Sequence, residues 1–275
     1  MPATAPLSAR LSGHGERIVC LHSSTGSSAQ WRDLQGALAQ RWEVLSPDLY
    51  GHGRSPAWPE DVASTLHVDA DAVAALAGIA SRPVHLVGHS YGGAVALRIA
   101  LRHPQRVRSL TLYEPVVFGM LKELAPADPA LGEIEEVAAS VASLVRAGCL
   151  GDAGRVFCGY WGGARAWGQM TDEQRQAVAM RMPAVPRHFD ACFGARWDAR
   201  LLQHLRMPVL LMHGSATRAS ARRVADLLAG ALPQVQRVEF GGAGHLGPLT
   251  HRETVTRWML THIDPRLAAA ETQRA

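Results

Sequence analysis

Short runs of apolar and β-branched residues alternate along this chain with longer stretches rich in alanine and leucine. The short runs predict buried strands, the longer stretches predict amphipathic helices, and the alternation is typical of a parallel sheet covered by helices. We predict strands at residues 17–22, 43–47, 84–88, 107–113, 209–213 and 236–240. We predict helices at residues 28–40, 66–79, 92–102, 221–232 and 253–262. The chain is therefore expected to adopt an α/β fold.

The alternation is interrupted between Phe118 and Leu205. Helix-like stretches, among them 133–147 and 172–182, follow one another there with no convincing strand. We therefore expect a helical subdomain at residues 118–204, inserted into a core that is formed by residues 1–117 and 205–275. The last residues, PRLAAAETQRA, predict a frayed tail.

Composition and charge narrow the class of protein. The chain has 275 residues, of which 47% are hydrophobic, which is enough for one globular unit with a sizeable core. The net charge of +4 is spread without runs of like charge, so we expect no nucleic-acid partner. Because we find neither a signal-peptide pattern nor a long apolar stretch, we expect a cytoplasmic protein without a membrane partner. The four cysteines lack disulfide or zinc spacing and are expected to be packed thiols.

The sequence GHSYGG at residues 88–93 carries the first sign of chemistry. It lies between an apolar run and a helix-like stretch, which is the strand-turn-helix context in which a Gly-x-Ser-x-Gly motif exposes a serine nucleophile. Glycines beside Ser90 remove side chains that would clash in the sharp turn. A glycine-rich turn whose serine only caps a helix is the alternative, and this context argues against it. Ser90 is therefore the predicted nucleophile.

Two further loops are placed to act with Ser90. His245 follows a glycine-rich segment after the last predicted strand, from where it can reach the serine as a general base. The small-residue loop after residues 17–22 is where a second oxyanion donor is expected. We predict the backbone N–H groups of Ser24 and Tyr91 as the oxyanion hole, although a plain turn remains an alternative for the loop.

The segments GHSYGG, PDLYGHGRS at 47–55 and GAGH at 242–245 together resemble the α/β-hydrolase superfamily. The resemblance extends from about residue 17 to residue 262. It implies a mostly parallel central sheet, a cap inserted after the sixth strand of that fold, and hydrolysis of a small-molecule substrate through an acyl-enzyme. It also implies that no cofactor is needed, and the spacing of the cysteines and histidines predicts no metal site.

One position departs from the family pattern. Members usually carry the acid of the triad in the loop after 209–213, where this chain has Thr217. Glu114, at the end of the strand at 107–113, resembles the acid of those haloalkane dehalogenases that carry a glutamate there, so we predict it as the catalytic acid. A structural carboxylate at the base of the cap is the alternative for Glu114. We interpret Asp48 as structural and expect Glu239 to point away from the site or to pair with a surface arginine.

Seven of the 16 aromatic residues of the chain lie in the predicted cap between residues 157 and 197, and we expect two or three of them to face the nucleophile. These aromatic residues are Phe157, Tyr160, Trp161, Trp167, Phe189, Phe193 and Trp197. Their chemistry favours a substrate with an apolar acyl or aryl group. Charged substrates also remain open, because Arg165, Arg187 or His188 could face inward.

We therefore expect a hydrolase that cleaves a carboxylic ester or thioester through an acyl-enzyme on Ser90. A carbon-carbon bond hydrolase of the same fold is an alternative, and so is a ligand-binding or regulatory member without catalysis. The deciding contact is the one between Glu114 and His245, because a catalytic acid must reach the histidine. Dehalogenase and epoxide hydrolase chemistry are disfavoured, since they need a carboxylate nucleophile where this chain has a serine.

Overall fold

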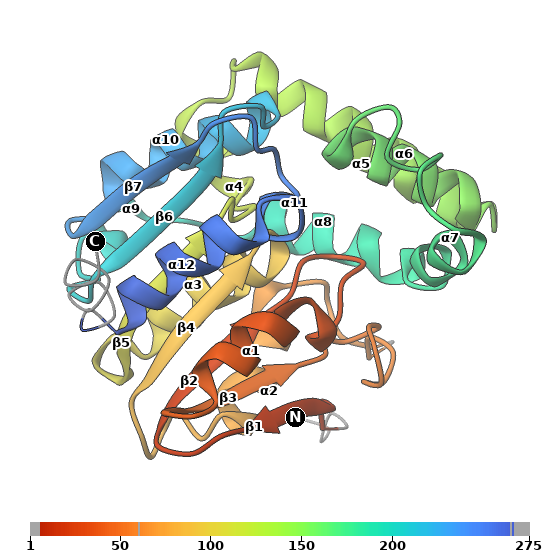
Figure 1. The fold of residues 1–275 in the computed structure, drawn as a ribbon. Helices are drawn as coiled ribbons and strands as arrows, with labels where there is room; N and C mark the ends of the chain where they lie inside the picture. Colours follow the sequence, from red (N-terminus) through yellow and green to blue (C-terminus); the bar gives the residue numbers. More distant parts are fainter. Residues whose placement is uncertain (1–5, 60, 265, 267–275) are drawn as a thin grey trace.

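The computed structural model describes residues 6–59, 61–264 and 266 of the chain. In this part of the chain seven strands form one sheet, in the order β1-β3-β2-β4-β5-β6-β7 (Figure 1). Only β1 runs antiparallel, against β3, and all other neighbours are parallel. The strands are β1 (Ala9–Ser12), β2 (Glu16–Leu21), β3 (Trp42–Pro47), β4 (Val84–His89), β5 (Val107–Tyr113), β6 (Val209–Gly214) and β7 (Val235–Phe240).

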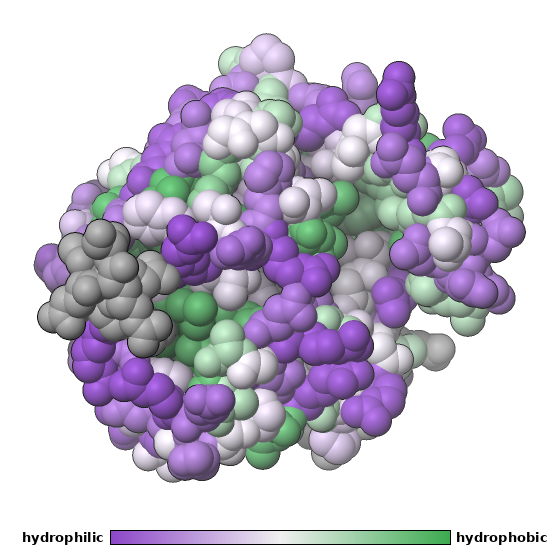
Figure 2. Space-filling model, viewed as in Figure 1, coloured by the Kyte–Doolittle hydropathy of each residue, from purple (hydrophilic) through white to green (hydrophobic). Residues whose placement is uncertain are grey.

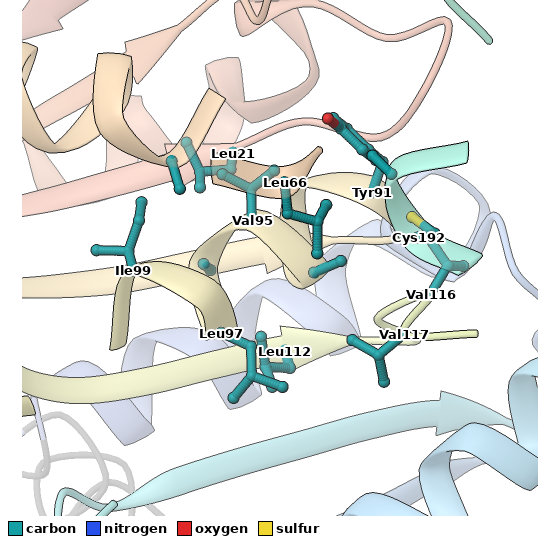
Figure 3. Packing of buried hydrophobic residues seen from close by; sticks show 14 of the residues in the cluster. Leu21, Leu66, Tyr91, Val95, Leu97, Ile99, Leu112, Val116, Val117 and Cys192 are labelled. Carbon is teal, nitrogen blue, oxygen red and sulfur yellow. The ribbon is translucent and has the colours of Figure 1, made fainter. Parts of the chain in front are cut away.

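Helices cover both faces of the sheet, and alternate residues of a strand serve the two sides. Ile18 and Cys20 of β2 belong to a buried cluster with α1 and α12, whereas Val19 and Leu21 belong to a cluster with α2, α3 and α10. Figure 3 shows part of the second cluster, around Val95 on α3. The helices outside the insertion are α1 (Arg32–Leu38), α2 (Leu66–Leu76), α3 (Tyr91–Arg102), α10 (Ala219–Ala231), α11 (Gly247–Thr250) and α12 (Arg252–Ile263). Two 3₁₀ helices, η1 (Ser28–Trp31) and η2 (Pro104–Arg106), lie in the connections.

Between β5 and β6 the chain forms helices and no strand, and all residues of this segment are described. Helices α5 to α8 of this insertion arch beyond the carboxyl ends of the strands (Figure 1). They are α4 (Gly119–Leu124), α5 (Pro129–Arg146), α6 (Leu150–Gly162), α7 (Asp172–Ala179), η3 (Met182–Ala184), α8 (Val185–Gly194) and α9 (Ala199–Leu202). The predicted helices at 133–147 and 172–182 correspond to α5 and to α7 with η3, so the expected helical character of this segment is confirmed.

Three details differ from the sequence prediction or lie outside the described residues. The edge strand β1 was not predicted, because its four residues carry only a weak apolar pattern and are paired by β3 alone. The helix predicted at 28–40 divides into η1 and α1. Of the predicted frayed tail, all but Arg266 lies outside the described residues. No helix in the described ranges is both long and apolar enough to cross a membrane.

The cysteines are free thiols, and Cys20, Cys158 and Cys192 are buried, as expected for packed side chains. Cys149 is exposed.

Candidate active site

Ser90 lies in the sharp turn between β4 and α3, with φ 57° and ψ −120°. A Cβ on Gly88 would lie only 2.5 Å from the carbonyl oxygen of Gly92, and one on Gly92 would collide with the carbonyl oxygen of Leu21. The two glycines therefore allow the strand and the helix to approach closely enough to form the turn. The N-terminus of α3, with its free N–H groups, begins directly after the serine.

Glu114 stands beside Ser90 because of the register of neighbouring strands. His89 pairs with Tyr113, and Tyr113 pairs with Met212, so Ser90 after β4 and Glu114 after β5 lie at one level, beside His213 of β6. The backbone N–H of Ser90 donates to the carbonyl oxygen of Tyr113 at 3.0 Å. The adjacent strands thus bring the predicted nucleophile and the predicted acid to the same edge.

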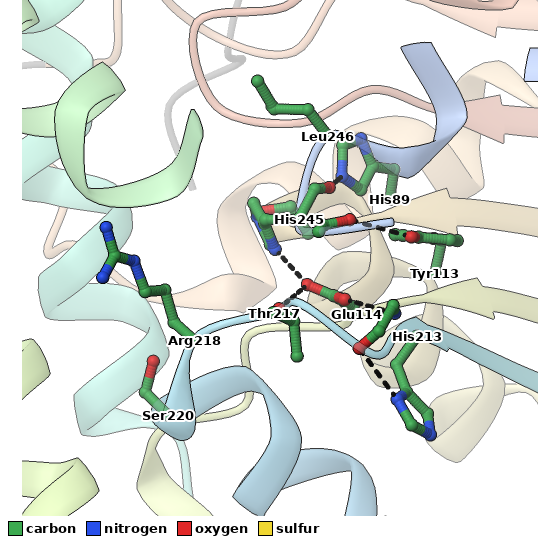
Figure 4. Close-up of polar contacts among 12 residues, drawn as sticks. His89, Tyr113, Glu114, His213, Thr217, Arg218, Ser220, His245 and Leu246 are labelled. Atoms are coloured by element: carbon green, nitrogen blue, oxygen red, sulfur yellow. Dashed lines mark hydrogen bonds and ion pairs between the residues drawn. The ribbon is translucent and has the colours of Figure 1, made fainter. Parts of the chain in front are cut away.

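His245 connects the two residues (Figure 4 shows its contact with Glu114). Its Nε2 lies 2.9 Å from Oγ of Ser90, and its Nδ1 lies 2.7 Å from Oε2 of Glu114. An ionised carboxylate only accepts hydrogen bonds, so Nδ1 carries the proton and Nε2 accepts from the serine hydroxyl. The ring stacks on Trp161 at 3.8 Å, and the backbone oxygen of His245 bonds Nε2 of His89 at 2.8 Å. These contacts fix both the tautomer and the orientation of the imidazole.

Glu114 is fully buried and accepts three hydrogen bonds. Besides His245, the backbone N–H of Gly214 donates to Oε1 at 2.8 Å and the hydroxyl of Thr217 donates to Oε2 at 2.6 Å. Burial raises the pKa of Glu114, but His245, Gly214 and Thr217 together outweigh it and hold this pKa below its usual value. The glutamate reaches the histidine and also accepts from the backbone N–H at the end of β6.

The loop after β2 approaches Ser90 from the other side. No hydrogen bond from the backbone N–H of Ser24 or of Tyr91 is formed to any described residue, so both remain available to a substrate oxygen. Thr25 adopts a positive φ of 62°, its N–H donates to Nε2 of His52, and its carbonyl accepts from Arg181 at 2.7 Å. The hydroxyl of Ser24 lies 2.7 Å from Nδ1 of His188 on α8. The inserted helices therefore hold this loop at two points.

Backbone strain is concentrated at the site. Among the described residues, those other than glycine that have a positive φ are Thr25, Ser90 and Glu114. Residues other than glycine rarely adopt a positive φ, and those that are held there cluster at functional sites. Ser90 and Glu114 contact His245, and Thr25 lies in the loop after β2 that approaches Ser90.

Two cavities meet at Ser90. The inner one, of about 20 Å³, holds no more than a water-sized group, and Ser24, Tyr91 and His188 contribute to its wall. The outer one, of about 490 Å³, reaches Ser90 and His245 and lies between the loop at 23–27, α6, α7 and α11. Figure 2 shows a hollow with apolar side chains between the inserted helices and the rest of the molecule. A substrate of moderate size can therefore reach the serine through the outer cavity.

Of the seven aromatic residues between 157 and 197, three line these cavities, namely Phe157, Trp161 and Phe189, and Phe118 at the start of the insertion lines the inner cavity as well. Of the polar residues that could face inward, His188 does so, whereas Arg165 is exposed and Arg187 lines neither cavity.

The carboxylates interpreted as non-catalytic have other partners. Asp48 accepts from the backbone N–H groups of Ser28 and Arg54, and Glu239 pairs with Arg222 at 3.0 Å. In the described ranges no group of three or more His, Cys, Asp or Glu residues is arranged to hold a metal ion.

The sequence interpretation missed two side chains at the site. Arg181 lines the outer cavity, and Thr217 holds Glu114. Thr217 had been noticed only as a missing aspartate. Arg181 follows α7 in a segment with no motif, so no sequence signal distinguishes it from the other arginines.

A family model described as alpha/beta hydrolase fold matches residues 16–252. The chain belongs to the alpha/beta hydrolase fold family. The match extends from β2 to the first residue of α12 and contains Ser90, Glu114 and His245. The resemblance inferred from the sequence motifs, and the α/β fold with its mostly parallel sheet, are thus confirmed.

The proteins that this chain resembles include esterases. A pimeloyl-[acyl-carrier protein] methyl ester esterase from Chromobacterium violaceum is 30% identical over 92% of this chain and 96% of its own length. The polyketide synthase ThaQ from Burkholderia thailandensis is 30% identical over 94% of this chain, which spans only 12% of that protein. The structure of an esterase from Thermogutta terrifontis is similar with a TM-score of 0.75 and 25% identity, covering 94% of this chain and 92% of that chain. Several other curated relatives match only in part, because the chain spans 38% or less of their length.

Proposed function

We propose that this chain hydrolyses carboxylic esters or thioesters through an acyl-enzyme on Ser90. The observation that carries the proposal is the continuous hydrogen-bonded series from Ser90 through His245 to Glu114, with distances of 2.9 and 2.7 Å. A serine beside a histidine whose other nitrogen is held by a carboxylate is the arrangement that activates a hydroxyl nucleophile. The near-full-length esterase relative supports the same reaction class.

The first half of the reaction forms the acyl-enzyme. Nε2 of His245 takes the proton of the Ser90 hydroxyl while Oγ attacks the substrate carbonyl, whose electron pair moves onto its oxygen. The N–H groups of Ser24 and Tyr91 stabilise this oxyanion, and the carboxylate of Glu114 stabilises the imidazolium. When the carbonyl reforms, the bond to the leaving group breaks and His245 gives its proton to the departing oxygen or sulfur.

The second half releases the acid. His245 now takes a proton from water, the resulting hydroxide equivalent attacks the acyl carbonyl, and the same N–H groups stabilise the second oxyanion. Collapse breaks the bond to Ser90 Oγ, which recovers its proton from His245. The enzyme returns to its starting state.

We further propose that residues 118–204 act as a cap over a core of residues 1–117 and 205–275. Phe157, Trp161 and Phe189 from the insertion line the cavities at Ser90, which supports a substrate with an apolar acyl or aryl group. The small inner cavity favours placing the bulk of the substrate in the outer one.

The two alternatives have less support. A ligand-binding role does not require the hydrogen bond between Glu114 and His245. Burying the Glu114 carboxylate costs free energy, and a binding role gives no reason for that cost. Carbon-carbon bond hydrolysis would use the same serine, and no contact at the site favours it over ester hydrolysis.

The test is the hydrolysis of p-nitrophenyl esters of increasing chain length by the wild type and by Ser90→Ala, Glu114→Gln and Glu239→Gln. We expect no turnover by Ser90→Ala and a loss in kcat of about a hundredfold or more in Glu114→Gln, since the histidine loses its partner. Glu239→Gln, a change at an exposed carboxylate, is the control and should have wild-type activity. An unaffected Glu114→Gln would contradict the acid assignment, and no turnover on any ester would contradict ester hydrolysis.

A further inference from the structure

The outer cavity contains a single permanent charge. Of the described residues that line it, Arg181 is the one arginine or lysine, and none is an aspartate or glutamate. Much of the remaining wall is apolar and consists of Phe157, Trp161, Met170, Val178, Leu246 and Leu249. The outer cavity is thus mostly apolar, and one cation lines it together with Ser90 and His245.

Arg181 has no acidic partner in the described part of the chain. It lies between α7 and η3, is half-buried, and donates from Nη1 to the carbonyl oxygen of Thr25 at 2.7 Å. Asp48 acts on Arg181 only through its charge at longer range, because the Asp48 carboxylate accepts from the N–H groups of Ser28 and Arg54. The bond to Thr25 is the only hydrogen bond that the guanidinium of Arg181 makes to a described residue.

A guanidinium has five N–H donors in a planar fork, which matches the two oxygens of a carboxylate. Keeping such a charge half-buried without a counter-charge is unfavourable, and an anionic ligand would remove that cost. From this geometry we propose that Arg181 binds an anionic group of the substrate. The preferred substrates are then esters or thioesters that carry a carboxylate some bonds away from the reacting carbonyl. This inference rests on the proposed ester hydrolysis at Ser90.

The loop after β2 links this anion site to the reacting centre. Arg181 is anchored to Thr25, and the neighbouring Ser24 supplies a proposed oxyanion donor. A substrate whose carbonyl lies at Ser24 and whose carboxylate lies at Arg181 would span adjacent parts of one cavity wall. The methylene groups between them would pack on the apolar side chains of that wall.

The test compares esters that differ only in the anionic group. The p-nitrophenyl half-esters of adipic and suberic acid have the same chain lengths as p-nitrophenyl hexanoate and octanoate, which lack the second carboxylate. A second pair, 4-carboxyphenyl and 4-carbamoylphenyl hexanoate, places the charge on the leaving group instead. The enzymes are the wild type, Arg181→Gln, Arg181→Lys and, as a control, the exposed Arg165→Gln.

We expect the wild type to prefer the carboxylate-bearing member of at least one pair by about tenfold or more in kcat/KM, mainly through KM. Arg181→Gln should reduce that ratio to about one, because any loss through the bond to Thr25 affects the charged and the neutral ester alike. Arg181→Lys should keep part of the preference, and Arg165→Gln should keep all of it. The pair that responds identifies the side of the ester that Arg181 contacts.

Failure of this inference differs from failure of the proposed function. If neutral esters are hydrolysed but carboxylates give no preference, or the preference survives in Arg181→Gln, the anion site is contradicted and ester hydrolysis stands. If no ester is hydrolysed, calorimetry that measures the binding of monomethyl adipate to Ser90→Ala tests the anion site. Binding by Ser90→Ala that is lost in the double variant with Arg181→Gln supports the anion site. No binding by Ser90→Ala, or equal binding by the double variant, contradicts it.

Discussion

The hydroxyl of Thr217 donates a 2.6 Å hydrogen bond to Oε2 of Glu114, the same oxygen that lies 2.7 Å from Nδ1 of His245. Thr217 occupies the loop after β6, where relatives usually carry the acid, whereas Glu114 follows the neighbouring strand β5. The two strand ends converge on one point beside the histidine. Either end can therefore offer a group that reaches Nδ1, and in this chain the longer glutamate from β5 does so while the threonine supports it.

This convergence predicts a rescue. In a Glu114→Gln background, Thr217→Asp should recover about tenfold or more of the lost kcat, because a carboxylate returns close to His245. Thr217→Asp alone should impair the enzyme, since it places two carboxylates side by side in a buried site. Steady-state kinetics on one ester measures all four combinations. Lack of recovery in the double variant would show that the acid cannot act from β6 in this chain.

Removing the threonine hydroxyl should change the pH profile. Thr217→Val deletes one of the hydrogen bonds that lower the pKa of Glu114, so the carboxylate becomes more basic. The acidic limb of kcat/KM should then move to higher pH, because the Glu114 carboxylate takes up a proton at a higher pH. Thr261→Val, which removes a half-buried hydroxyl on α12, is the control. A limb that stays in place or moves to lower pH contradicts this role for Thr217.

The contact between Ser24 and His188 should be coupled to catalysis. Ser24→Ala and His188→Ala each break the 2.7 Å hydrogen bond that ties the loop after β2 to α8. Each variant should lower kcat by about tenfold with a smaller effect on KM, since the oxyanion donor is less well held. The double variant should lose little more than either single one. Additive losses would mean that the two side chains act independently.

Asp69 should make folding stability depend on pH. Burial raises its pKa from 3.8 to about 6, although the N–H of Tyr50 and the hydroxyl of Tyr91 donate to it and act in the opposite direction. The folded state therefore keeps a proton that the unfolded state has released, so this contribution is present below about pH 4 and is lost as pH rises through about 6. The rise in the pKa of Asp69 from 3.8 to about 6 corresponds to a loss of about 3 kcal/mol in the free energy of unfolding.

Urea unfolding between pH 4 and pH 7 measures this effect as a difference between variants. The free energy of unfolding of the wild type, relative to Asp69→Asn, should fall across that range. Asp71→Asn, at an exposed position of the same helix, should leave the pH dependence as it is in the wild type. A constant difference between wild type and Asp69→Asn would contradict the raised pKa.

The sequence predicted the parts of this molecule that depend on local pattern. The five central parallel strands and β7 have apolar or β-branched runs of ordinary length, and GHSYGG carries its own turn chemistry at Ser90. Glu114 was predicted from its position after β5, because parallel strands end at one edge. The structure brings it to His245, from a position 131 residues earlier in the chain.

Other features depend on contacts that no local pattern encodes. The bond of Arg181 to Thr25 joins residues 156 positions apart, and that of His188 to Ser24 joins residues 164 apart. The role of Thr217 follows from where Glu114 ends in space, and β1 is a strand only because β3 offers it a partner. Packing of the inserted helices, rather than periodicity, decides which aromatic residues face Ser90.

The most direct test of the central claim is to trap the acyl-enzyme. Rapid mixing of excess p-nitrophenyl ester with the enzyme, followed by acid quench and mass spectrometry of the digested protein, locates any acyl group. We predict a burst of p-nitrophenol of about one equivalent and an acyl mass on the peptide that contains Ser90, both absent in Ser90→Ala. Turnover without an adduct on that peptide, together with activity retained by Ser90→Ala, would contradict the account.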